Sequence, residues 1–382
     1  MARLFILTFL FGIFCIGGGM YGCATQHMKD CSTDPVFPKG KAEVVANLNM
    51  PPGNIAVSND HRIFFTFHPE ANPEIKIAEL VEGNAIPFPN GDFQNDQNDH
   101  DEAPFFDTVL SVRIDSNNNL WTLDHGFFGI RQPRLLAFDI NTGNIIHQHD
   151  FSSDIAGFGS FLNDFQVDPS GNYIIIADTG APAPVVGGDP AIIVYEIEKK
   201  TARRVLDNHE SVQATSNTLR VGKEDLTMMG IPIHIAVDSI ALARDAKWLY
   251  YAPLNSEKLF RIQAESLINP EITEDGLAGM VELFAEKGMS DGITTDMEGN
   301  IYISDMENSA VHIIDQDRKL KTLLKDPDFR WPDGFSFGPD GWLYFTCSAL
   351  MDVIGQSDSH IESHAPYQIY RFQPGGTGVP GH

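Results

Sequence analysis

Short apolar runs separated by polar turns recur along this chain, and their recurrence is its most informative feature. In each copy a strand-like run is followed by a turn rich in Asp, Asn and Gly, and then by a second run rich in aromatic residues. Six copies are visible, beginning near residues 52, 110, 162, 237, 290 and 332. Runs of this length and composition, bounded by such turns, predict pairs of β-strands.

The spacing of the copies indicates how the strands are assembled. Copies lie about 40 to 75 residues apart, which suits blades of four antiparallel strands with loop insertions. Several units must pack together before any one of them buries its apolar face. The chain is therefore predicted to be an all-β protein, a six-bladed β-propeller formed by residues 42–374.

The way in which the ring closes is predicted as well. Residues 42–49 are strand-like but precede the first copy, whereas the last copy has two obvious strands plus the segment YQIYRF. Together these segments complete four strands. We expect the N-terminal strand to join the last blade as its outer strand, which removes an open sheet edge.

Both ends of the chain differ from the repeating part. Residues 1–22 contain one basic residue, an apolar run and small residues, a pattern typical of an export signal and short for a spanning helix. The Gly-Cys pair at its end fits a bacterial lipoprotein cleavage site with Cys23 as the lipidated residue. We expect an exported protein, periplasmic or at the cell surface, that touches the membrane only through this anchor. Plain secretion and an uncleaved N-terminal anchor are the alternatives. Residues 23–41 are expected to be a polar tether and residues 375–382 a flexible tail.

The cysteines and the charge limit the possible classes of protein. After Cys15 and Cys23, only Cys31 and Cys347 could form a disulfide, and the sequence does not fix the distance between them. The formal net charge of −26 argues against nucleic-acid partners, which need a concentrated Lys/Arg patch. A small molecule is the expected partner.

Alignment of the copies places one residue of each blade at the same point, just before the strand that lines the central channel. These six residues are Gly53, Leu110, Asn163, Asp238, Asp291 and Asp333. The next residue of each of the first three blades adds Asn54, Ser111 and Asp164. We expect Asn54, Asn163, Asp238, Asp291 and Asp333 to bind a ligand at one mouth of the channel.

Two explanations of the aligned polar residues remain open. Carboxylates and amides that converge on one axis would suit a divalent cation such as Ca²⁺, with Asn163, Asp238 and Asp291 as ligands. Alternatively, Asp, Asn and Gly recur because each blade makes the same turn, in which the side chain caps backbone amides.

The second strand of each copy returns to the same mouth and brings another set of side chains. They are His68, His125, Asp178, Asn255, Asn308 and Ser348. Histidine transfers protons near neutral pH, so His125, together with Asp164, is a candidate acid or base. Aromatic residues nearby, Phe127, Phe128 and Trp331, could wall a pocket or could serve only to pack the blades.

Motifs of several other enzyme classes are absent from the sequence. The chain has no G-x-S-x-G nucleophile elbow, no H-E-x-x-H zinc motif and no glycine-rich loop for a phosphate or dinucleotide. No nucleotide cofactor is therefore expected.

Several phrases resemble the major royal jelly protein and Yellow family, in a bacterial branch. Among them are PPGNIAVSNDHRIFFTFHP, VLSVRIDSNNNLWTLDHG, RLLAFDINTG, SFLNDFQVDPSGNYIIIADTG, PAIIVYEIEKKTARRVLDNH and WPDGFSFGPDGWLYFT, in the order that the family shows. The resemblance implies an exported six-bladed propeller, with dopachrome tautomerisation and binding of aromatic amines as the nearest activities. That family has no single activity.

The chain is more distantly similar to the gluconolactonase and senescence marker protein family, whose divalent metal is held by a Glu, two Asn and an Asp. That similarity places Asn163 on one asparagine, Asp238 where the second would be and Asp291 on the aspartate. The glutamate has no equivalent, because Gly53 stands at its position, and this departure weakens the case for a lactonase.

Three functions follow from these observations. The first is a tautomerase or isomerase that acts on a small polar or aromatic molecule by proton transfer at the channel mouth. The second is a metal-dependent lactone hydrolase. The third is a binder of small amines without turnover, attracted by the acidic mouth.

Overall fold

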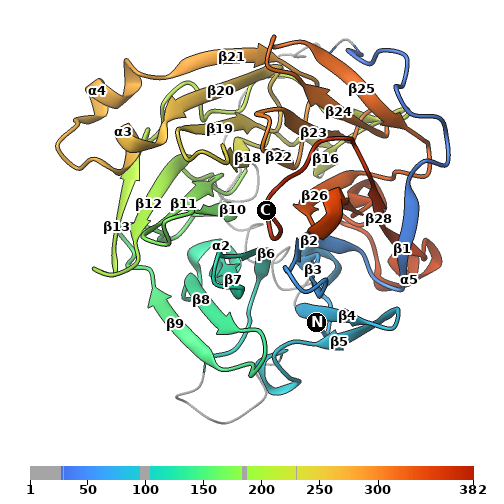
Figure 1. Cartoon of the computed structure of the whole chain (residues 1–382), viewed down its shortest axis with the longest axis horizontal. Coiled ribbons are helices and arrows are strands. Elements are labelled where there is room, and N and C mark those ends of the chain that lie inside the picture. Colours follow the sequence, from blue (N-terminus) through green and yellow to red (C-terminus); the bar gives the residue numbers. More distant parts are fainter. Residues whose placement is uncertain (1–26, 29, 95–103, 183–186, 229) are drawn as a thin grey trace, which may run out of the picture.

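The computed structural model describes residues 27–28, 30–94, 104–182, 187–228 and 230–382. Six four-stranded antiparallel sheets surround a central axis (Figure 1), so the predicted six-bladed propeller is confirmed. The export signal and Cys23 lie outside the described residues. Within the described part of the chain, no helix is both long and apolar enough to cross a membrane.

Each blade runs from an innermost strand beside the axis to an outermost strand at the rim. Blade A comprises, in that order, β2 (Pro52–Val57), β3 (Ile63–Phe67), β4 (Ile77–Val81) and β5 (Asn84–Pro87). Blade B comprises β6 (Val109–Ile114), β7 (Asn119–Asp124), β8 (Arg134–Asp139) and β9 (Ile145–Asp150). Blade C comprises β10 (Leu162–Val167), β11 (Tyr173–Asp178), β12 (Ala191–Glu196) and β13 (Thr201–Val205).

Blade D comprises β18 (Val237–Leu242), β19 (Trp248–Pro253), β20 (Lys258–Gln263) and β21 (Glu282–Glu286). Blade E comprises β22 (Ile293–Thr295), β23 (Ile301–Asp305), β24 (Ala310–Ile314) and β25 (Leu320–Lys325). Blade F comprises β26 (Pro332–Phe337), β27 (Leu343–Cys347), β28 (Tyr367–Phe372) and β1 (Glu43–Leu48). The short helices lie in connections: η1 (Pro69–Ala71), η2 (Asp92–Gln94), α2 (Gly126–Gly129), α3 (Ala264–Ile268), α4 (Glu274–Ala278), η3 (Pro339–Gly341), η4 (Leu350–Asp352) and α5 (Asp358–Ser363).

The N-terminal strand closes the ring, as predicted. β1 pairs antiparallel with β28, from Glu43 opposite Arg371 to Leu48 opposite Tyr367. It therefore becomes the outer strand of blade F and covers the edge that β28 would otherwise expose.

Each blade is held to the next by apolar side chains that project from the sheet faces. Between blades A and B, for example, Phe64, Phe88 and Phe138 lie edge to face at centroid distances of 4.9 and 5.8 Å. Edge-to-face rings suit the quadrupole of an aromatic side chain and add to the burial of apolar area. This is why the second run of each sequence copy is rich in aromatics.

A β-bulge at the start of the inner strands explains why the aligned side chains turn toward the axis. In blades A, B, C, D and F the pairing of the inner strand slips at the residue that follows Pro52, Val109, Leu162, Val237 and Pro332, respectively. A bulge leaves one residue unpaired and re-aims its side chain. The aligned position of the sequence copies is that residue.

Threonine hydroxyl groups form hydrogen bonds with the backbone N–H and C=O groups at these bulges, and in doing so they connect neighbouring blades. Thr66 Oγ1 accepts from Asn54 N–H at 2.9 Å and donates to Leu110 O of the next blade at 2.9 Å. Thr346 Oγ1 of blade F likewise accepts from Gly334 N–H at 3.0 Å and donates to Gly53 O of blade A. Because the bulge leaves backbone groups without a ladder partner, these hydroxyls are needed to satisfy them.

An insertion between blades C and D lies against the end of the ring at which the aligned residues gather. Its two small sheets are β14 (Arg220–Val221) with β15 (Glu224–Asp225), and β16 (Thr227–Met228) with β17 (Ile231–Pro232). Buried Leu219, Leu226 and Ile233 of the insertion pack in one apolar cluster with Met289 and Trp331, which flank the aligned residues.

The segment after residue 374 is packed, in contrast to the flexible tail expected from its Gly-rich sequence. It runs back to the centre of the ring (Figure 1), where Phe337 N–H donates to His382 O at 2.6 Å and Ile114 N–H donates to Gly381 O at 3.2 Å. Phe337 and Ile114 are the last residues of inner strands β26 and β6. Residues 375–382 therefore occupy the end of the channel opposite the aligned residues.

The described part of the expected tether, residues 27–28 and 30–41, is packed as well. Val36 and Phe37 donate their backbone N–H groups to Thr322 O and Leu323 O, both at 3.0 Å, and so extend blade E beyond β25. The Phe37 ring packs at 6.1 Å from Phe372. Thr33 and Thr322 also exchange two hydrogen bonds, and Met28 packs against an apolar cluster, so a segment whose polar composition favours a free linker is held on the propeller. Cys31 and Cys347 are both free thiols.

Candidate functional site

The structure brings the predicted polar residues together at one mouth of the channel. Asn163 Nδ2 donates to Asp238 Oδ2 at 2.8 Å, and the Asp238 and Asp291 carboxyl groups are hydrogen-bonded to each other. Asn54, Asn163 and Asp238 are buried, whereas Asp291 and Asp333 keep partial contact with solvent. The mouth is therefore a polar cluster contributed by blades A, C, D, E and F, with access from the side of blades E and F.

Arg113 organises the half of the mouth that blades A, B and C form. Its guanidinium donates to Asp164 Oδ2 at 2.6 Å and also to Asn54 Oδ1. The Arg113 and Asp164 side chains are only 3% and 8% exposed. Asp164 is held on its other oxygen by Ser111 Oγ at 3.1 Å. An ion pair this deeply buried fixes the geometry of its neighbours, and breaking it by removal of one partner is costly.

The remaining carboxylates have no comparable counter-charge. Burial, followed by the charge of Asp291, raises the pKa of Asp238 well above its usual range. Burial and the charge of Asp291 raise the pKa of Asp333 in the same way. Burial raises the pKa of Asp291 to about 6, although the Trp331 indole N–H opposes the rise. Near neutral pH this cluster therefore retains protons that isolated aspartates would have lost.

Burial also raises the pKa of Asp164, because its effect exceeds the opposing charge of Arg113. The structure thus separates the mouth into an ion-paired half and a half in which carboxylates share protons.

Trp331 fixes the position of Asp291. Its Nε1–H donates to Asp291 Oδ2 at 2.6 Å, and the residue is 1% exposed. The backbone of Trp331 is left-handed, with φ of 55°. This conformation is rare for a bulky residue and persists only where the surroundings enforce it. Here Ser348 N–H donates to Trp331 O at 3.0 Å and helps to hold it.

On the opposite side of the mouth, the loop after β7 forms one turn of left-handed helix. Gly126, Phe127, Phe128 and Gly129 have φ of 57°, 51°, 57° and 68°. His125 Nδ1 accepts from Phe128 N–H at 3.0 Å and caps the turn. Two consecutive phenylalanines in this region cost about 1–2 kcal/mol each. The flanking glycines lower the cost of the turn, because glycine adopts this region without strain.

The left-handed turn presents an aromatic wall, which consists of Phe127, Phe128 and Phe161. Phe128 lies edge to face with Phe161 at 5.1 Å, and His125 contacts Phe161 at 4.9 Å. Phe127 and Phe128 remain partly exposed. Burial lowers the pKa of His125 to about 3, so this histidine is neutral and accepts a hydrogen bond at Nδ1. The acid or base role predicted for His125 remains a prediction, whereas its cap of the turn is observed.

The variant Phe127→Asn is expected to stabilise the protein and to weaken binding of aromatic molecules. Asparagine tolerates the left-handed region, so about 1 kcal/mol of backbone strain is relieved, while one ring of the wall is lost. Chemical denaturation measures the first effect, and calorimetric titration with an aromatic amine measures the second. A loss of stability without any change in affinity would contradict the role given to this ring.

The other residues predicted at the ends of the second strands serve mainly as backbone caps, which corrects part of the sequence prediction. Asp178 accepts from Phe161 N–H at 2.8 Å and from Ser160 Oγ at 2.7 Å, and it pairs with Arg204. Asn255 accepts from Ile235 N–H at 2.7 Å. Such side chains satisfy loop amides that have no ladder partner.

At Asn308 the cap comes from Asp305, whose carboxylate accepts from Asn308 N–H at 2.9 Å and from the Asn308 side-chain amide at 2.9 Å. Ser348 is an exception, since its hydroxyl reaches Asp333 of the mouth.

The mouth fits a divalent cation only in part. Asn163, Asp238 and Asp291 offer oxygen atoms, but Ca²⁺ takes about six to eight of them. The first-blade position cannot add a carboxylate, because a Cβ on Gly53 would lie 2.8 Å from Thr66 Oγ1. Among the described residues, three carboxylate, His or Cys ligand atoms gather within 4.8 Å in two places, and neither is the mouth.

Sequence reasoning missed two charged residues of this site. Arg113 lies two residues beyond Ser111 on the same inner strand. An arginine inside a mainly apolar strand could have indicated a buried partner for its charge. Lys287 is 3% exposed and donates to Ser256 O at 2.8 Å and to Gly288 O at 3.0 Å. Burial lowers the pKa of Lys287 to about 7, although the charge of Asp305 opposes the shift.

The fold and the mouth define a six-bladed propeller with a polar cluster at one end of its channel, and solved structures of similar shape agree with the propeller fold. A luciferin-regenerating enzyme has a TM-score of 0.57 and 12% identity, covering 89% of this chain and 97% of that one. Regucalcin from Agrobacterium tumefaciens, a calcium-binding protein, has a TM-score of 0.57 and 16% identity, covering 88% and 96%. At these identities the likeness concerns the fold alone.

The family model described as "Major royal jelly protein" matches residues 107–328, so the chain belongs to the major royal jelly protein family. Major royal jelly protein 6 of Apis mellifera is 25% identical over 232 residues, 57% of this chain and 50% of that protein. Major royal jelly protein 3 is 22% identical over 246 residues, 62% of this chain and 42% of that protein. The chain spans about half the length of the curated relatives it matches.

Proposed function

We propose that the mouth binds a small organic cation with an aromatic ring, and that protons shared by Asp238, Asp291 and Asp333 exchange with it. The observation that carries this proposal is the convergence of these three carboxyl groups at the mouth, where burial raises the pKa of each and where no salt bridge to them is found among the described residues. A bound ammonium would supply the missing charge. Like charges in a poorly solvated site are strongly stabilised by such a neutralising group.

The aromatic wall supports the choice of an aromatic ligand. Partly exposed Phe127 and Phe128 offer faces and edges for a planar ring, and Asp291 and Asp333 also keep partial contact with solvent. A ligand that carries both a ring and an ammonium would use both kinds of group. The family resemblance, which implies binding of aromatic amines, agrees with this pairing of chemistries.

Proton transfer would give the site a catalytic role. A carboxyl group with a pKa of about 6 donates and accepts protons readily near neutral pH, which a tautomerase requires. Asp291 suits this role better than Asp164, whose oxygens are engaged by Arg113 and Ser111. Tautomerisation is therefore the reaction we propose for the site, with Asp291 as the acid and base.

Calorimetric titration with dopamine, with neutral catechol and with Ca²⁺ tests the proposed function. Dopamine is expected to bind more tightly than catechol by tenfold or more, because only dopamine carries the ammonium. Assays on dopachrome and on simple lactones then distinguish a tautomerase, a lactonase and a binder without turnover. Equal affinity for dopamine and catechol, or a requirement for a divalent metal in lactone hydrolysis, would overturn the proposal.

Affinity for the ammonium ligand is expected to rise as the pH increases from 5 to 7. The cation needs an ionised carboxylate, and the proton on Asp291 competes with it below a pH of about 6, by up to about tenfold per pH unit. Titration in buffers of different ionisation enthalpy measures the proton released. Neutral catechol is the control, and an affinity for dopamine that is constant over this range would contradict the mechanism.

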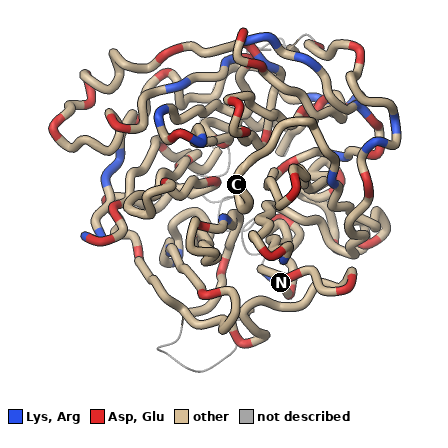
Figure 2. The backbone as a smooth tube through the Cα atoms, viewed as in Figure 1, with Lys and Arg blue, Asp and Glu red and all other residues tan. Residues whose placement is uncertain are grey.

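The location and partners of the protein are proposed from its charge and from its N-terminal sequence. Acidic residues are spread over all six blades (Figure 2), consistent with a formal net charge of −26 and no nucleic-acid partner. We infer export with a lipid on Cys23 as the membrane anchor. Incorporation of labelled palmitate by the wild type, and its absence in Cys23→Ser, is the expected result in a bacterial host.

A further inference from the structure

The excursion between β27 and β28 carries a cluster of metal-binding side chains away from the mouth. His360 lies in α5 and His364 follows the last turn of the same helix. Their rings are stacked with centroids 4.1 Å apart and planes 25° apart. Asp352 reaches the same point from η4. The ligand atoms of these three residues all lie within 4.8 Å of one another.

A hydrogen bond to the backbone sets the ring nitrogen that His364 can offer to an ion. His364 Nδ1 lies 2.8 Å from His360 O, and a carbonyl only accepts, so Nδ1 carries the hydrogen. Neutral His364 therefore has its lone pair on Nε2, which points toward Asp352 Oδ1 at 3.9 Å. This distance is too long for a hydrogen bond but suits two ligands of one ion. A backbone carbonyl that orients a histidine in this way is a common support of metal ligands.

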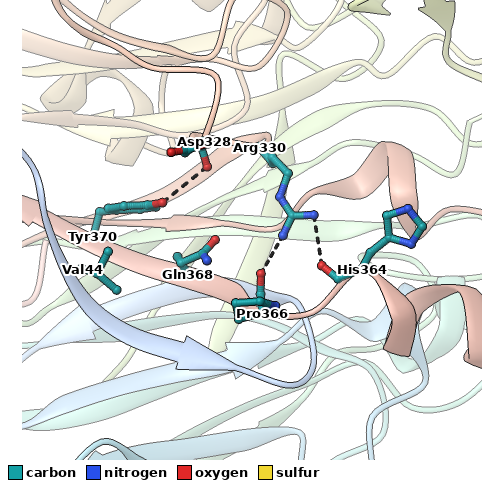
Figure 3. Close-up of a pocket in the computed structure, with 7 residues that line it drawn as sticks. All are labelled: Val44, Asp328, Arg330, His364, Pro366, Gln368 and Tyr370. Atoms are coloured by element: carbon teal, nitrogen blue, oxygen red, sulfur yellow. Dashed lines mark hydrogen bonds between the residues drawn. The ribbon is translucent and has the colours of Figure 1, made fainter. Parts of the chain in front are cut away.

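Arg330 holds the carboxylate and the chain around it. Its guanidinium lies 3.4 Å from Asp352 Oδ2, which leaves Oδ1 on the side of His364. The same guanidinium donates to His364 O at 3.1 Å and to Pro366 O at 2.7 Å (Figure 3). Arg330 and His364 also line a pocket of 470 Å³ beside the outer strands β28 and β1 of blade F. The cluster is thus braced on one side and open to solvent on the other.

We propose that Asp352, His360 and His364 form a binding site for Zn²⁺. Two imidazoles and one carboxylate are a ligand set that Zn²⁺ prefers, whereas Ca²⁺ and Mg²⁺ prefer oxygen ligands. Ligand atoms about 2.1 Å from a tetrahedral ion lie roughly 3.4 Å apart, so the side chains need only small rotations to bind it. Three protein ligands leave a fourth position for water or for a molecule in the adjacent pocket.

A bound ion would stiffen the part of blade F that packs beside the mouth. Leu350, Val353 and Ile361 of the excursion lie in the same apolar cluster as Trp331. The ion would join η4 to α5, the two elements that contribute these side chains. Binding to the folded state also stabilises the protein by mass action.

Zinc titration of the protein, freed of any polyhistidine tag and dialysed against a chelator, tests this proposal. In competition with a chromogenic chelator, one Zn²⁺ is expected to bind, with a rise in melting temperature. Co²⁺ in place of Zn²⁺ is expected to give visible d–d absorption of a site with nitrogen and oxygen ligands. His360→Asn and His364→Asn should each weaken binding at least tenfold, and the double variant should abolish it.

Two control variants locate the ion. His61→Asn removes an exposed histidine elsewhere and should leave zinc affinity unchanged. Cys31→Ser removes a ligand of the other cluster, Cys31 with Asp305 and His312, and should also have no effect. Absence of zinc binding by the wild type, or wild-type affinity in the folded double variant, would overturn the proposal. None of these outcomes depends on a ligand at the mouth, so the two proposals are tested separately.

Discussion

Asp291→Asn is expected to abolish binding of an aromatic ammonium at the mouth and yet to raise the free energy of unfolding at pH 7. Burial raises the pKa of Asp291 to about 6 from an ordinary 3.8, so the folded state holds this proton more tightly than the unfolded chain does. The stability that comes from the bound proton is lost as the pH rises from about 4 to about 6. Asparagine carries no charge to bury, and its oxygen can still accept from Trp331 Nε1.

The gain from Asp291→Asn is expected to be about 1–3 kcal/mol above pH 6, because each unit of pKa shift corresponds to about 1.4 kcal/mol. Urea denaturation at pH 4 and pH 7 measures it, and the two proteins should differ less at pH 4. The affinity for dopamine should fall by 100-fold or more. Lower stability of the variant at pH 7, or an unchanged affinity, would contradict the account of a protonated, ligand-binding carboxylate.

Arg113→Met is expected to destabilise the protein by about 3–5 kcal/mol at pH 8, the largest effect on stability that we predict. The change leaves the buried Asp164 carboxylate without its counter-charge, a situation far more costly than the net value of the pair. Asn54 loses its partner at the same time. Because Asp164 can then take up a proton, the penalty should be smaller at pH 5 than at pH 8.

A double variant and a surface pair provide the controls for Arg113→Met. Addition of Asp164→Asn should recover much of the lost stability, since the uncompensated charge is removed. Arg134→Met, which breaks the pair with Asp150 in the same blade, should cost less than about 1 kcal/mol, because Asp150 is 42% exposed. Equal effects of the two arginine variants in denaturation experiments would refute the special role of Arg113.

The fold could be predicted because each blade repeats the same local chemistry. The aromatic-rich second strand, the polar turn and the bulged start of the inner strand recur in the sequence, and the register of blades A, B, C, D and F places the bulge at the aligned residue. The convergence of Asn163 and Asp238 followed from this symmetry, and Asp291 reaches the same mouth from the residues just before β22 of blade E, which has no such bulge. The raised pKa values of Asp238 and Asp291 did not follow from it, since they depend on the burial of these side chains in the folded protein.

The unpredicted parts of the site depend on contacts that no repeat encodes. Arg113 joins Asn54 and Asp164, which lie in different blades, and the reach of a long side chain is not visible in a local pattern. The left-handed turn at Gly126 places a costly conformation on two phenylalanines, against their intrinsic preference. The packed segments at both ends are held by contacts with distant parts of the chain, such as the one between Phe37 and Phe372.

The pairing of β1 with β28 has a consequence for how the chain reaches its native state. Glu43 and Arg371 are neighbours in the sheet although almost the whole propeller separates them along the chain. Such a high contact order slows folding, since a very large loop must close before blade F gains its fourth strand. During synthesis β1 emerges before β28 and has to wait for this partner, and over that interval its unpaired edge is open to non-native pairing.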